Sequence, residues 1–270
     1  MYPKSIAHLD TIPKLKGVLC DIDDTLTHHG QLLPEAFLAL SQLKQLGIRV
    51  VPITGRPGGW VDQIARMWPV DGVVGENGGL WFWFDGKKMQ RRFVQSAQER
   101  KANKDRLKTL AEVILKKIPG CALASDQPYR DLDLAIDFCE DVPPLSPQAI
   151  DDIVHCFEQA GATCKVSSIH VNGWFGDFDK LQGFKQFHSE RFGEEICFDD
   201  WAFFGDSAND EPMFQAFKWS FGVANVQDFL PRLQHPPKWI CSKEGGMGFV
   251  EGIKKLFPKI QMSKDRPLGQ

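Results

Sequence analysis

The sequence predicts an α/β protein, with a Rossmann-like parallel-sheet core that is interrupted by an α+β segment. Short apolar runs that suit buried strands alternate with segments of helical periodicity, which is typical of a parallel sheet covered by helices. The runs at residues 18–20, 50–53 and 202–204 each end in polar residues. Because parallel strands bring their carboxyl ends to one edge of a sheet, we expect these polar residues to meet there.

The core elements follow from periodicity and from Pro and Gly positions. A helix is expected over residues 32–46, since Pro34 stands near its start and Gly47 follows its end. The other expected core elements are strands at 48–53, 72–74 and 81–84 and a helix over 60–67.

Residues 85–172 interrupt this alternation and contain none of the acidic segments described below. The elements expected there are helices over 106–117 and 147–160 and strands at 132–138 and 163–171. The chain therefore divides into a core of residues 1–84 and 173–270 and an insert of residues 85–172, with hinges near 84–85 and 173–177. Residues 262–270 are polar and contain Pro and Gly, and we expect them to fray.

Composition excludes several classes of function. The net charge of −3 and pI near 6.2, without a basic stripe, argue against nucleic-acid and membrane-surface partners. No apolar run approaches the ~18 residues of a membrane span, and no signal-peptide pattern is present. The seven cysteines are scattered and form no CxxC pair, which favours reduced thiols and a cytoplasmic location.

The most informative stretch is Asp21-Ile22-Asp23-Asp24-Thr25, directly after the first apolar run. Side chains at i and i+2 of an extended backbone point to the same side, so Asp21 and Asp23 are expected to project together. Two carboxylates held this close need a proton, a cation or a lysine to compensate them. This pattern favours a metal-assisted site with a carboxylate nucleophile.

Three further segments follow in order along the chain. The second apolar run ends in Thr54-Gly55-Arg56, and the third ends in the segment GDSAND at residues 205–210. Between them, Lys180 follows Asp179 and opens a run with helical spacing. Each segment is common alone, but the four together form a specific constellation.

These segments, DIDDTLT, ITGRP, DKLQGF and GDSANDEPMF, resemble the motifs of the haloacid dehalogenase superfamily of phosphatases. GDSAND, the late lysine and the glycine-rich segment at 75–79 are most similar to its Cof-type branch, which includes sucrose-phosphate, trehalose-phosphate and mannosyl-phosphoglycerate phosphatases. The resemblance covers residues 15–84 and 173–250 and is weak between them. It implies that the insert at 85–172 is a cap domain that determines substrate specificity.

The resemblance implies Mg²⁺-dependent hydrolysis of a phosphomonoester through an aspartyl-phosphate on Asp21. Asp23 would be the general acid and then the general base. Mg²⁺ would be held by Asp21, the backbone carbonyl of Asp23 and Asp206. Lys180 and Thr54 would contact the phosphoryl group.

Supporting roles are expected for four further residues. Asn209 and Asp210 are expected to orient Lys180 and metal-bound water. Gly55 and Arg56 follow Thr54 and would support the phosphate or its loop, although Arg56 could equally be a surface residue.

Substrate contacts are expected from the cap and from one core turn. Ser168, His170 and Asn172 would share one face of a strand, which is either solvated or turned to the crevice to bind sugar hydroxyls. Trp174 could add a stacking surface. Asn77 belongs to a hairpin-like turn and could also face the substrate.

The sequence thus predicts a Mg²⁺-dependent phosphatase for a small phosphorylated metabolite, in particular a sugar phosphate. A phosphosugar mutase of the same superfamily would use the same aspartyl-phosphate but shield it from water. A non-catalytic binding protein could retain the fold alone. The presence of every central carboxylate favours an enzyme.

Overall fold

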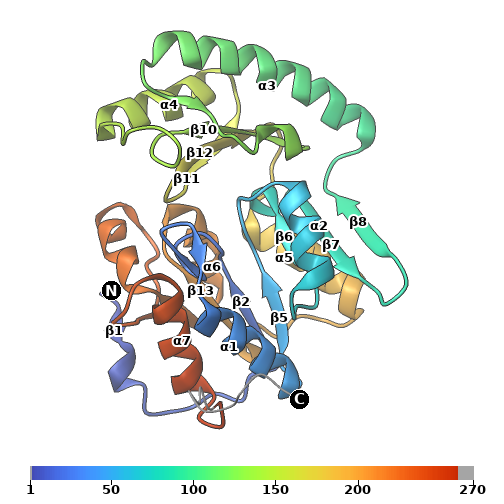
Figure 1. Cartoon of the computed structure of the whole chain (residues 1–270), viewed down its shortest axis with the longest axis vertical. Helices are drawn as coiled ribbons and strands as arrows, with labels where there is room; N and C mark the ends of the chain where they lie inside the picture. Colours follow the sequence, from blue (N-terminus) through green and yellow to red (C-terminus); the bar gives the residue numbers. More distant parts are fainter. Residues whose placement is uncertain (1, 261–270) are drawn as a thin grey trace.

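The computed structural model describes residues 2–260, and at its centre is a six-stranded parallel sheet (Figure 1). Its order is β1-β15-β14-β13-β2-β5, and all neighbours pair in parallel. The strands are β1 (Lys4–Ser5), β15 (Trp239–Ile240), β14 (Trp219–Gly222), β13 (Trp201–Gly205), β2 (Gly17–Cys20) and β5 (Arg49–Pro52). The α/β class predicted from the sequence is confirmed; the segment 262–270, expected to fray, lies outside the described residues.

Helices cover both faces of this sheet. They are α1 (Pro34–Gln45) and α7 (Gly245–Leu256) on one face, and α5 (Lys180–Phe192) and α6 (Glu211–Ala216) on the other. Within β2, Val18 and Cys20 pack in the cluster of α1 and α7, whereas Leu19 packs in the cluster of α5 and α6. Burial on both faces explains why the strand is a continuous apolar run.

A small antiparallel sheet extends the core beside α2 (Gly58–Met67). It consists of β6 (Val73–Gly75), β7 (Leu80–Phe84) and β8 (Met89–Phe93). An isolated parallel bridge from Ile53 to Val74 joins it to the edge of the main sheet. Because β8 pairs with β7 along its whole length, we propose that the first hinge lies near residues 94–96, later than the expected 84–85.

The insert, called the cap below, is a four-stranded antiparallel sheet with two helices on its outer face (Figure 1). Its strands, in spatial order, are β11 (Thr163–Val166), β12 (His170–Trp174), β10 (Asp133–Asp137) and β9 (Ala122–Leu123). Leu134, Ile136 and Val171 pack against α3 (Ala97–Lys117) and α4 (Pro147–Gln159). The alternate positions carry polar side chains, and these belong to the other face of the sheet.

Two expectations for the cap are wrong in detail. The single strand expected over 163–171 is a hairpin, with a turn in which Ser167 N donates to His170 O at 2.9 Å. Helix α3 begins nine residues before the expected 106, at a capping box of Ser96 and Glu99. The first half of α3 is too charged to show apolar periodicity, and only the N-terminal capping box marks where the helix starts. Since β12 continues to Trp174, we propose the second hinge near residues 175–177.

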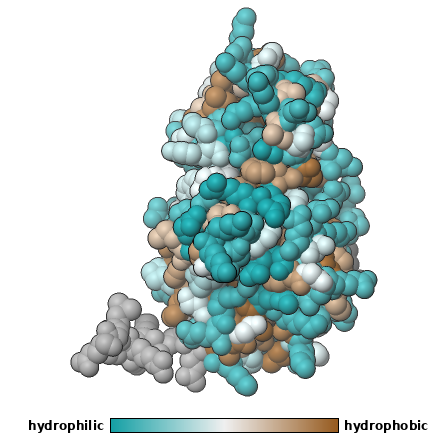
Figure 2. Space-filling model, turned by 90° about the vertical axis from the view of Figure 1, so that its right-hand side faces the viewer, coloured by the Kyte–Doolittle hydropathy of each residue, from teal (hydrophilic) through white to brown (hydrophobic). Residues whose placement is uncertain are grey.

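Hydrophilic side chains cover most of the face shown in Figure 2. Among the helices of residues 2–260, none combines the length and apolar composition needed to cross a bilayer. All seven cysteines, which lie within the described residues, are unpaired.

Candidate active site

The predicted catalytic residues meet at the carboxyl edge of the main sheet. Asp21 follows β2, Thr54 follows β5 and Asp206 follows β13, so three parallel strands end at one place. Asp21 N donates to Phe204 O at 2.9 Å, which continues the pairing of β2 and β13 into the site. All three side chains are buried.

Lys180 lies between two carboxylates. It is the first residue of α5, and its Nζ is 2.7 Å from Asp21 Oδ1 and 2.7 Å from Asp210 Oδ1. The helix start is held by Asp179, whose side chain accepts a hydrogen bond from Gln182 N. Although burial opposes the charge, Asp21 and Asp210 raise the pKa of Lys180. The ammonium is therefore a fixed positive charge beside Asp21.

Asp206 completes an acidic cluster. Carboxylate oxygens of Asp21, Asp206 and Asp210 all lie within 4.8 Å of one another. Thr25 Oγ1 donates to Asp206 Oδ1 at 3.0 Å, which ties the end of the first motif to the last. Both carboxylate oxygens of Asp210 are engaged: Oδ1 accepts from Lys180 Nζ, and Oδ2 accepts from the backbone N–H groups of Asp206 and Ser207. These contacts leave Asp210 less available to a cation than Asp21 and Asp206.

The electrostatics of this cluster call for additional positive charge. Burial raises the pKa of Asp21 to about 8 against the opposing charge of Lys180, with Asp210 and Asp23 adding to the rise. Burial, followed by Asp21 and Asp210, raises the pKa of Asp206 well above its ordinary value. Three buried carboxylates share one ammonium. An all-oxygen set with excess negative charge fits a hard divalent cation.

Asp23 is held apart from this cluster by Arg56. Arg56 Nε donates to both oxygens of Asp23 at 3.0 Å, and Nη2 lies 2.9 Å from Asp23 Oδ1. The Arg56 side chain is only 6% exposed. Its guanidinium stacks over Trp60, 4.7 Å from the ring centroid. Arg56 is therefore a buried part of the site, and the alternative of a surface residue is wrong.

The loop after β5 is locked to two other loops. Thr54 Oγ1 accepts from Arg56 N at 3.0 Å, and Thr54 O accepts from Asn77 N at 3.1 Å. Asn209 Nδ2 donates to Asn77 Oδ1 at 3.2 Å. A β-carbon on Gly55 would lie 3.3 Å from the Asn77 amide, so the loops are closely packed. Asn77 is buried between the loops and adopts a left-handed φ of 53°, which asparagine tolerates.

The polar face of β12 is turned to the catalytic residues. His170 and Asn172 are each 2% exposed, so the alternative of a solvated face is wrong for them. Both line the crevice that also contains Asp21 and Asp23. Ser168 reaches the crevice from the preceding turn, not from the strand. Trp174 instead stacks on Phe178 at 5.3 Å within the apolar core and offers no surface to a ligand there.

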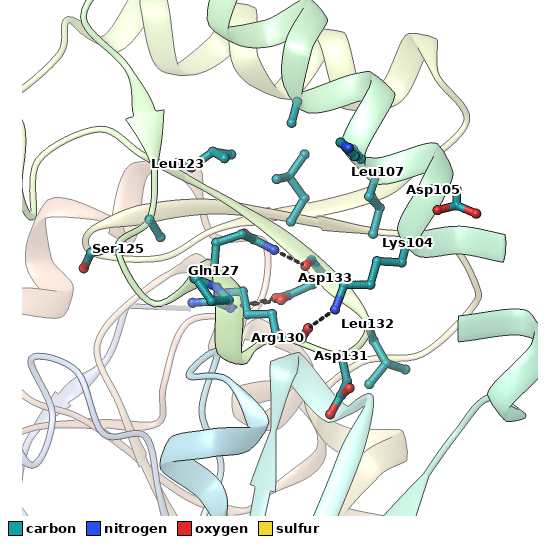
Figure 3. Close-up of a pocket in the computed structure, with 15 residues that line it drawn as sticks. Lys104, Asp105, Leu107, Leu123, Ser125, Gln127, Arg130, Asp131, Leu132 and Asp133 are labelled. Carbon is teal, nitrogen blue, oxygen red and sulfur yellow. Dashed lines mark hydrogen bonds and ion pairs between the residues drawn. The ribbon is translucent and has the colours of Figure 1, made fainter. Parts of the chain in front are cut away.

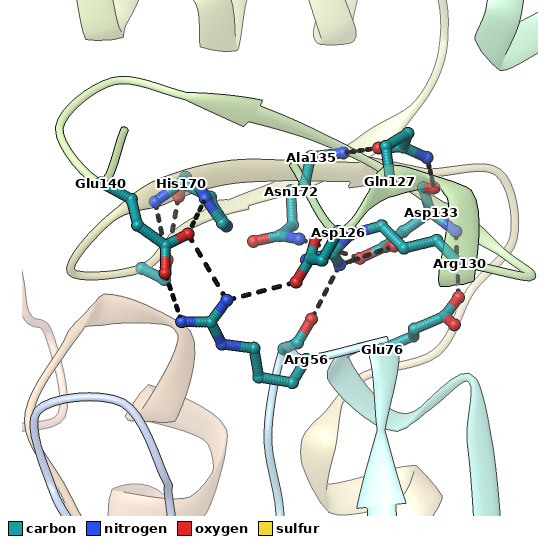
Figure 4. A network of polar contacts seen from close by, with 12 residues as sticks. Arg56, Glu76, Asp126, Gln127, Arg130, Asp133, Ala135, Glu140, His170 and Asn172 are labelled. Carbon is teal, nitrogen blue, oxygen red and sulfur yellow. Dashed lines mark hydrogen bonds and ion pairs between the residues drawn. The ribbon is translucent and has the colours of Figure 1, made fainter. Parts of the chain in front are cut away.

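A network of arginines and carboxylates joins the cap to the core (Figure 4). Arg130 is fully buried and pairs with Asp126 and Asp133, and its Nη1 donates to Gly55 O at 2.8 Å. Asn172 Nδ2 donates to Asp133 Oδ2 at 2.9 Å. The network thus connects the cap sheet directly to the loop after β5.

Glu76 is the other buried link between cap and core. It accepts hydrogen bonds from the backbone N–H groups of Gly58 and of cap residues 131–133. Burial, followed by the charge of Asp133, raises the pKa of Glu76 to about 8, although the backbone donors and Arg130 oppose the rise.

Sequence reasoning assigned no role to Thr25, Glu76, Asp126, Arg130, Asp133 or Glu140. Thr25 belongs to the first motif, so its presence there could have indicated a role in the site. The cap residues follow no fixed spacing, so only their placement in space brings them together.

The crevice under the cap is nearly filled. Its cavity has a volume of about 10 Å³, which is room for a single water molecule. A larger cavity of about 610 Å³ lies within the cap, between α3 and the segment around Leu132 (Figure 3). Arg130 lines both cavities. The smaller one, beside Asp21 and Asp23, has no room for a molecule much larger than water.

Comparison with known proteins agrees with this geometry. The family model for haloacid dehalogenase-like hydrolases matches residues 18–121. The phosphoglycolate phosphatase of Methanospirillum hungatei is 29% identical over 258 residues, which cover 91% of this chain and 98% of that protein. The phosphoglycolate phosphatase of Methanoculleus marisnigri is 26% identical, with the same two coverages.

Solved structures share the fold over nearly the whole chain. Protein 0175 of Thermoplasma acidophilum has a TM-score of 0.69 at 19% identity and covers 91% of this chain and 99% of its own. The sucrose-phosphatase of Synechocystis sp. PCC6803 has a TM-score of 0.62 at 15% identity, with coverages of 90% and 98%.

Proposed function

We propose that the chain, which matches the family model for haloacid dehalogenase-like hydrolases, is a Mg²⁺-dependent phosphatase of a sugar phosphate or similar small metabolite. The observation that carries this proposal is the buried contact of Lys180 with Asp21 at 2.7 Å, beside the acidic cluster at the sheet edge. A carboxylate nucleophile beside a fixed cation is suited to phosphoryl transfer.

Asp21 attacks the phosphorus of the ester. A bond forms between a carboxylate oxygen and phosphorus, and the bond from phosphorus to the ester oxygen breaks. Lys180 places positive charge beside the nucleophile and the phosphoryl oxygens. Because Thr54 Oγ1 accepts from Arg56 N, its own proton is available to a phosphoryl oxygen. When bound by Asp21, Asp206 and the backbone carbonyl of Asp23, Mg²⁺ supplies charge neutralisation for the phosphoryl group.

Asp23 handles the protons. It gives a proton to the leaving alkoxide and later takes one from the water that attacks the phosphorus of the aspartyl-phosphate. Inorganic phosphate leaves, Asp21 is regenerated, and Asp23 is again protonated. Arg56 holds the Asp23 carboxylate in place for both transfers.

The cap lining favours a hydroxyl-rich leaving group. Ser168, His170 and Asn172 of the cap line the crevice beside Asp21 and Asp23. The two guanidinium groups that also line it, those of Arg56 and Arg130, are already paired with carboxylates of the protein. Hydroxyl, imidazole and amide groups can exchange hydrogen bonds with the hydroxyl groups of a substrate, which supports a sugar or polyol phosphate.

The test is release of inorganic phosphate from a panel of sugar phosphates, phosphoglycolate and p-nitrophenyl phosphate, with Mg²⁺ present and with Asp21→Asn as the control. We expect release from at least one sugar phosphate at the highest kcat/KM. Phosphoglycolate as the best substrate would overturn the substrate class. An isomerised phosphosugar would show a mutase, and binding without turnover would show a non-catalytic protein.

We also propose that the protein acts in the cytoplasm. Seven unpaired cysteines, of which Cys20 and Cys241 are buried, suit a reducing compartment.

A further inference from the structure

We propose that Glu140 of the cap is a positioning residue for proton transfer: it orients Arg56, and through Arg56 the carboxylate of Asp23, when the cap lies on the core. This inference rests on the proposed function. It makes the proton-transfer machinery of the core complete only in contact with the cap.

Arg56 of the core contacts Glu140 and Asp126 of the cap (Figure 4). Arg56 Nη2 lies 2.6 Å from Glu140 Oε1 and 2.9 Å from Asp23 Oδ1, so one nitrogen bridges the two carboxylates. Arg56 Nη1 lies 3.2 Å from Asp126 Oδ2, a second cap carboxylate. The core carboxylate and the cap carboxylates together hold the whole guanidinium.

Glu140 is itself fixed within the cap. It follows β10, and its backbone N–H donates to Asp137 Oδ1 at 2.8 Å, as does that of Cys139 at 2.9 Å. Its second oxygen, Oε2, lies 2.9 Å from His170 Nε2. Although burial opposes the shift, His170 and Arg56 lower the pKa of Glu140 to about 2, so the side chain is charged at neutral pH.

Removal of the cap contacts would leave Arg56 with Asp23 as its only carboxylate partner among those described, beside the ring face of Trp60. An arginine side chain has many rotamers, and two core-side contacts through Nε and Nη2 leave Nη1 without its carboxylate partner. A displacement of the catalytic group by about 1 Å can lower a rate by about a hundredfold. Glu140 therefore acts on proton transfer through Arg56, without any contact to the reacting atoms.

This role predicts a dependence on the leaving group. The proton from Asp23 matters most when the leaving group is a poor one, and it matters little for p-nitrophenolate, which departs unaided. The quantity to measure is kcat/KM, which reports the steps up to transfer of the phosphoryl group to Asp21. Aryl phosphates lack sugar hydroxyls, so direct substrate contacts of Glu140 do not contribute.

The experiment compares phenyl phosphate with p-nitrophenyl phosphate for wild type, Glu140→Ala and Glu140→Gln. We expect Glu140→Ala to lower kcat/KM about tenfold to a hundredfold on phenyl phosphate and less than about twofold on p-nitrophenyl phosphate. Glu140→Gln keeps an acceptor for Arg56 and should recover part of the loss. Asp23→Asn removes the proton donor itself, so it should show the largest difference between the losses of kcat/KM on the two esters.

Asp141→Asn is the matched control, because Asp141 is the exposed neighbour on the same turn and should match wild type on both esters. Thermal unfolding checks that the variants are folded. Equal losses of Glu140→Ala on both esters, or no loss on either, would overturn the role of Glu140. Absence of phosphate release by wild type from every ester would instead overturn the proposed function.

Discussion

The backbone of Gly78 packs directly against Gly183 in the first turn of α5. A β-carbon on Gly183 would lie 2.5 Å from the Cα atom of Gly78, and one on Gly78 would lie 1.9 Å from Asp179 O. Gly78 also has a φ of +102°, which favours glycine. The glycine-rich turn at 75–79 is therefore the surface on which the start of α5, and with it Lys180, is seated.

Gly183→Ala is expected to displace this helix start. The added methyl group has no room, so Lys180 should shift away from Asp21 and kcat should fall about tenfold or more. Overpacking should also lower the free energy of unfolding by about 1 to 3 kcal/mol. Steady-state kinetics measures the change in kcat, and urea unfolding measures the change in the free energy of unfolding.

Gly193→Ala is the control on the same helix. Gly193 ends α5 with a φ of +67° and has open space around it, so alanine should cost about 1 kcal/mol of stability through backbone strain alone. Because Lys180 lies at the other end, kcat should be unchanged. A normal kcat in Gly183→Ala would contradict the seating of Lys180 by the glycine turn.

Asp21→Asn should abolish turnover while the fold remains. The amide removes the nucleophile but also one of the three crowded carboxylates, whose pKa burial raises to about 8. The melting temperature of the metal-free protein should therefore hold or rise. Asp105→Asn, on the exposed face of α3, should change neither property. If Asp21→Asn kept more than about a tenth of kcat, Asp21 would not be the attacking group.

Activity should require a divalent cation, with Mg²⁺ best and Ca²⁺ inhibitory, because Ca²⁺ prefers more ligands at longer distances. Asp206→Ala should raise the Mg²⁺ concentration needed for half-maximal activity by about tenfold or more. Titration of the EDTA-treated enzyme measures both. Full activity in EDTA would contradict the assignment of the acidic cluster.

Glu76 predicts a pH dependence of stability. Its pKa is raised to about 8 in the folded protein from 4.5, so the folded state binds more protons between these values. The contribution of Glu76 to the free energy of unfolding is therefore fully present below pH 4.5 and is lost as pH rises through 8. Glu76→Gln should flatten this decline in melting temperature between pH 5 and 8. An equal decline in both proteins would show that Glu76 does not titrate in this range.

Cap residues should govern the choice of ester. Asn172→Ala removes the amide that faces the crevice and should lower kcat/KM on the preferred sugar phosphate about tenfold to a hundredfold, from a loss of ~1 to 3 kcal/mol. The loss on p-nitrophenyl phosphate should be smaller. Leu123→Ala, on the far strand of the same sheet, is the control. Equal losses on both esters would place specificity elsewhere.

The core could be predicted from the sequence because its signals are local. A strand, a turn and a polar residue fall within a few positions, and parallel pairing then brings Asp21, Thr54 and Asp206 together. The cap offered weaker signals. The turn of the hairpin at 163–174 is marked in the sequence by the polar pair Ser167-Ser168 alone, without Gly or Pro, so Ser168 lies in a turn where a strand was expected.

The links between cap and core could not be predicted from one chain. Arg56, Asp126 and Glu140 are separated by long stretches of sequence and have no fixed spacing. Their pairing depends on how the cap sits on the core, which no local pattern encodes. Trp174 was misjudged for a related reason, since its position on β12 says nothing of Phe178, which covers it.

The space left under the cap, about 10 Å³, also bears on which acceptor receives the phosphoryl group. This space has room for one water molecule but not for glycerol or a second sugar, so an acceptor larger than water needs additional room under the cap. Transphosphorylation to added alcohols should then be a minor reaction, and inorganic phosphate should account for most of the ester consumed. In such an enzyme, the size of the acceptor favours hydrolysis of the intermediate.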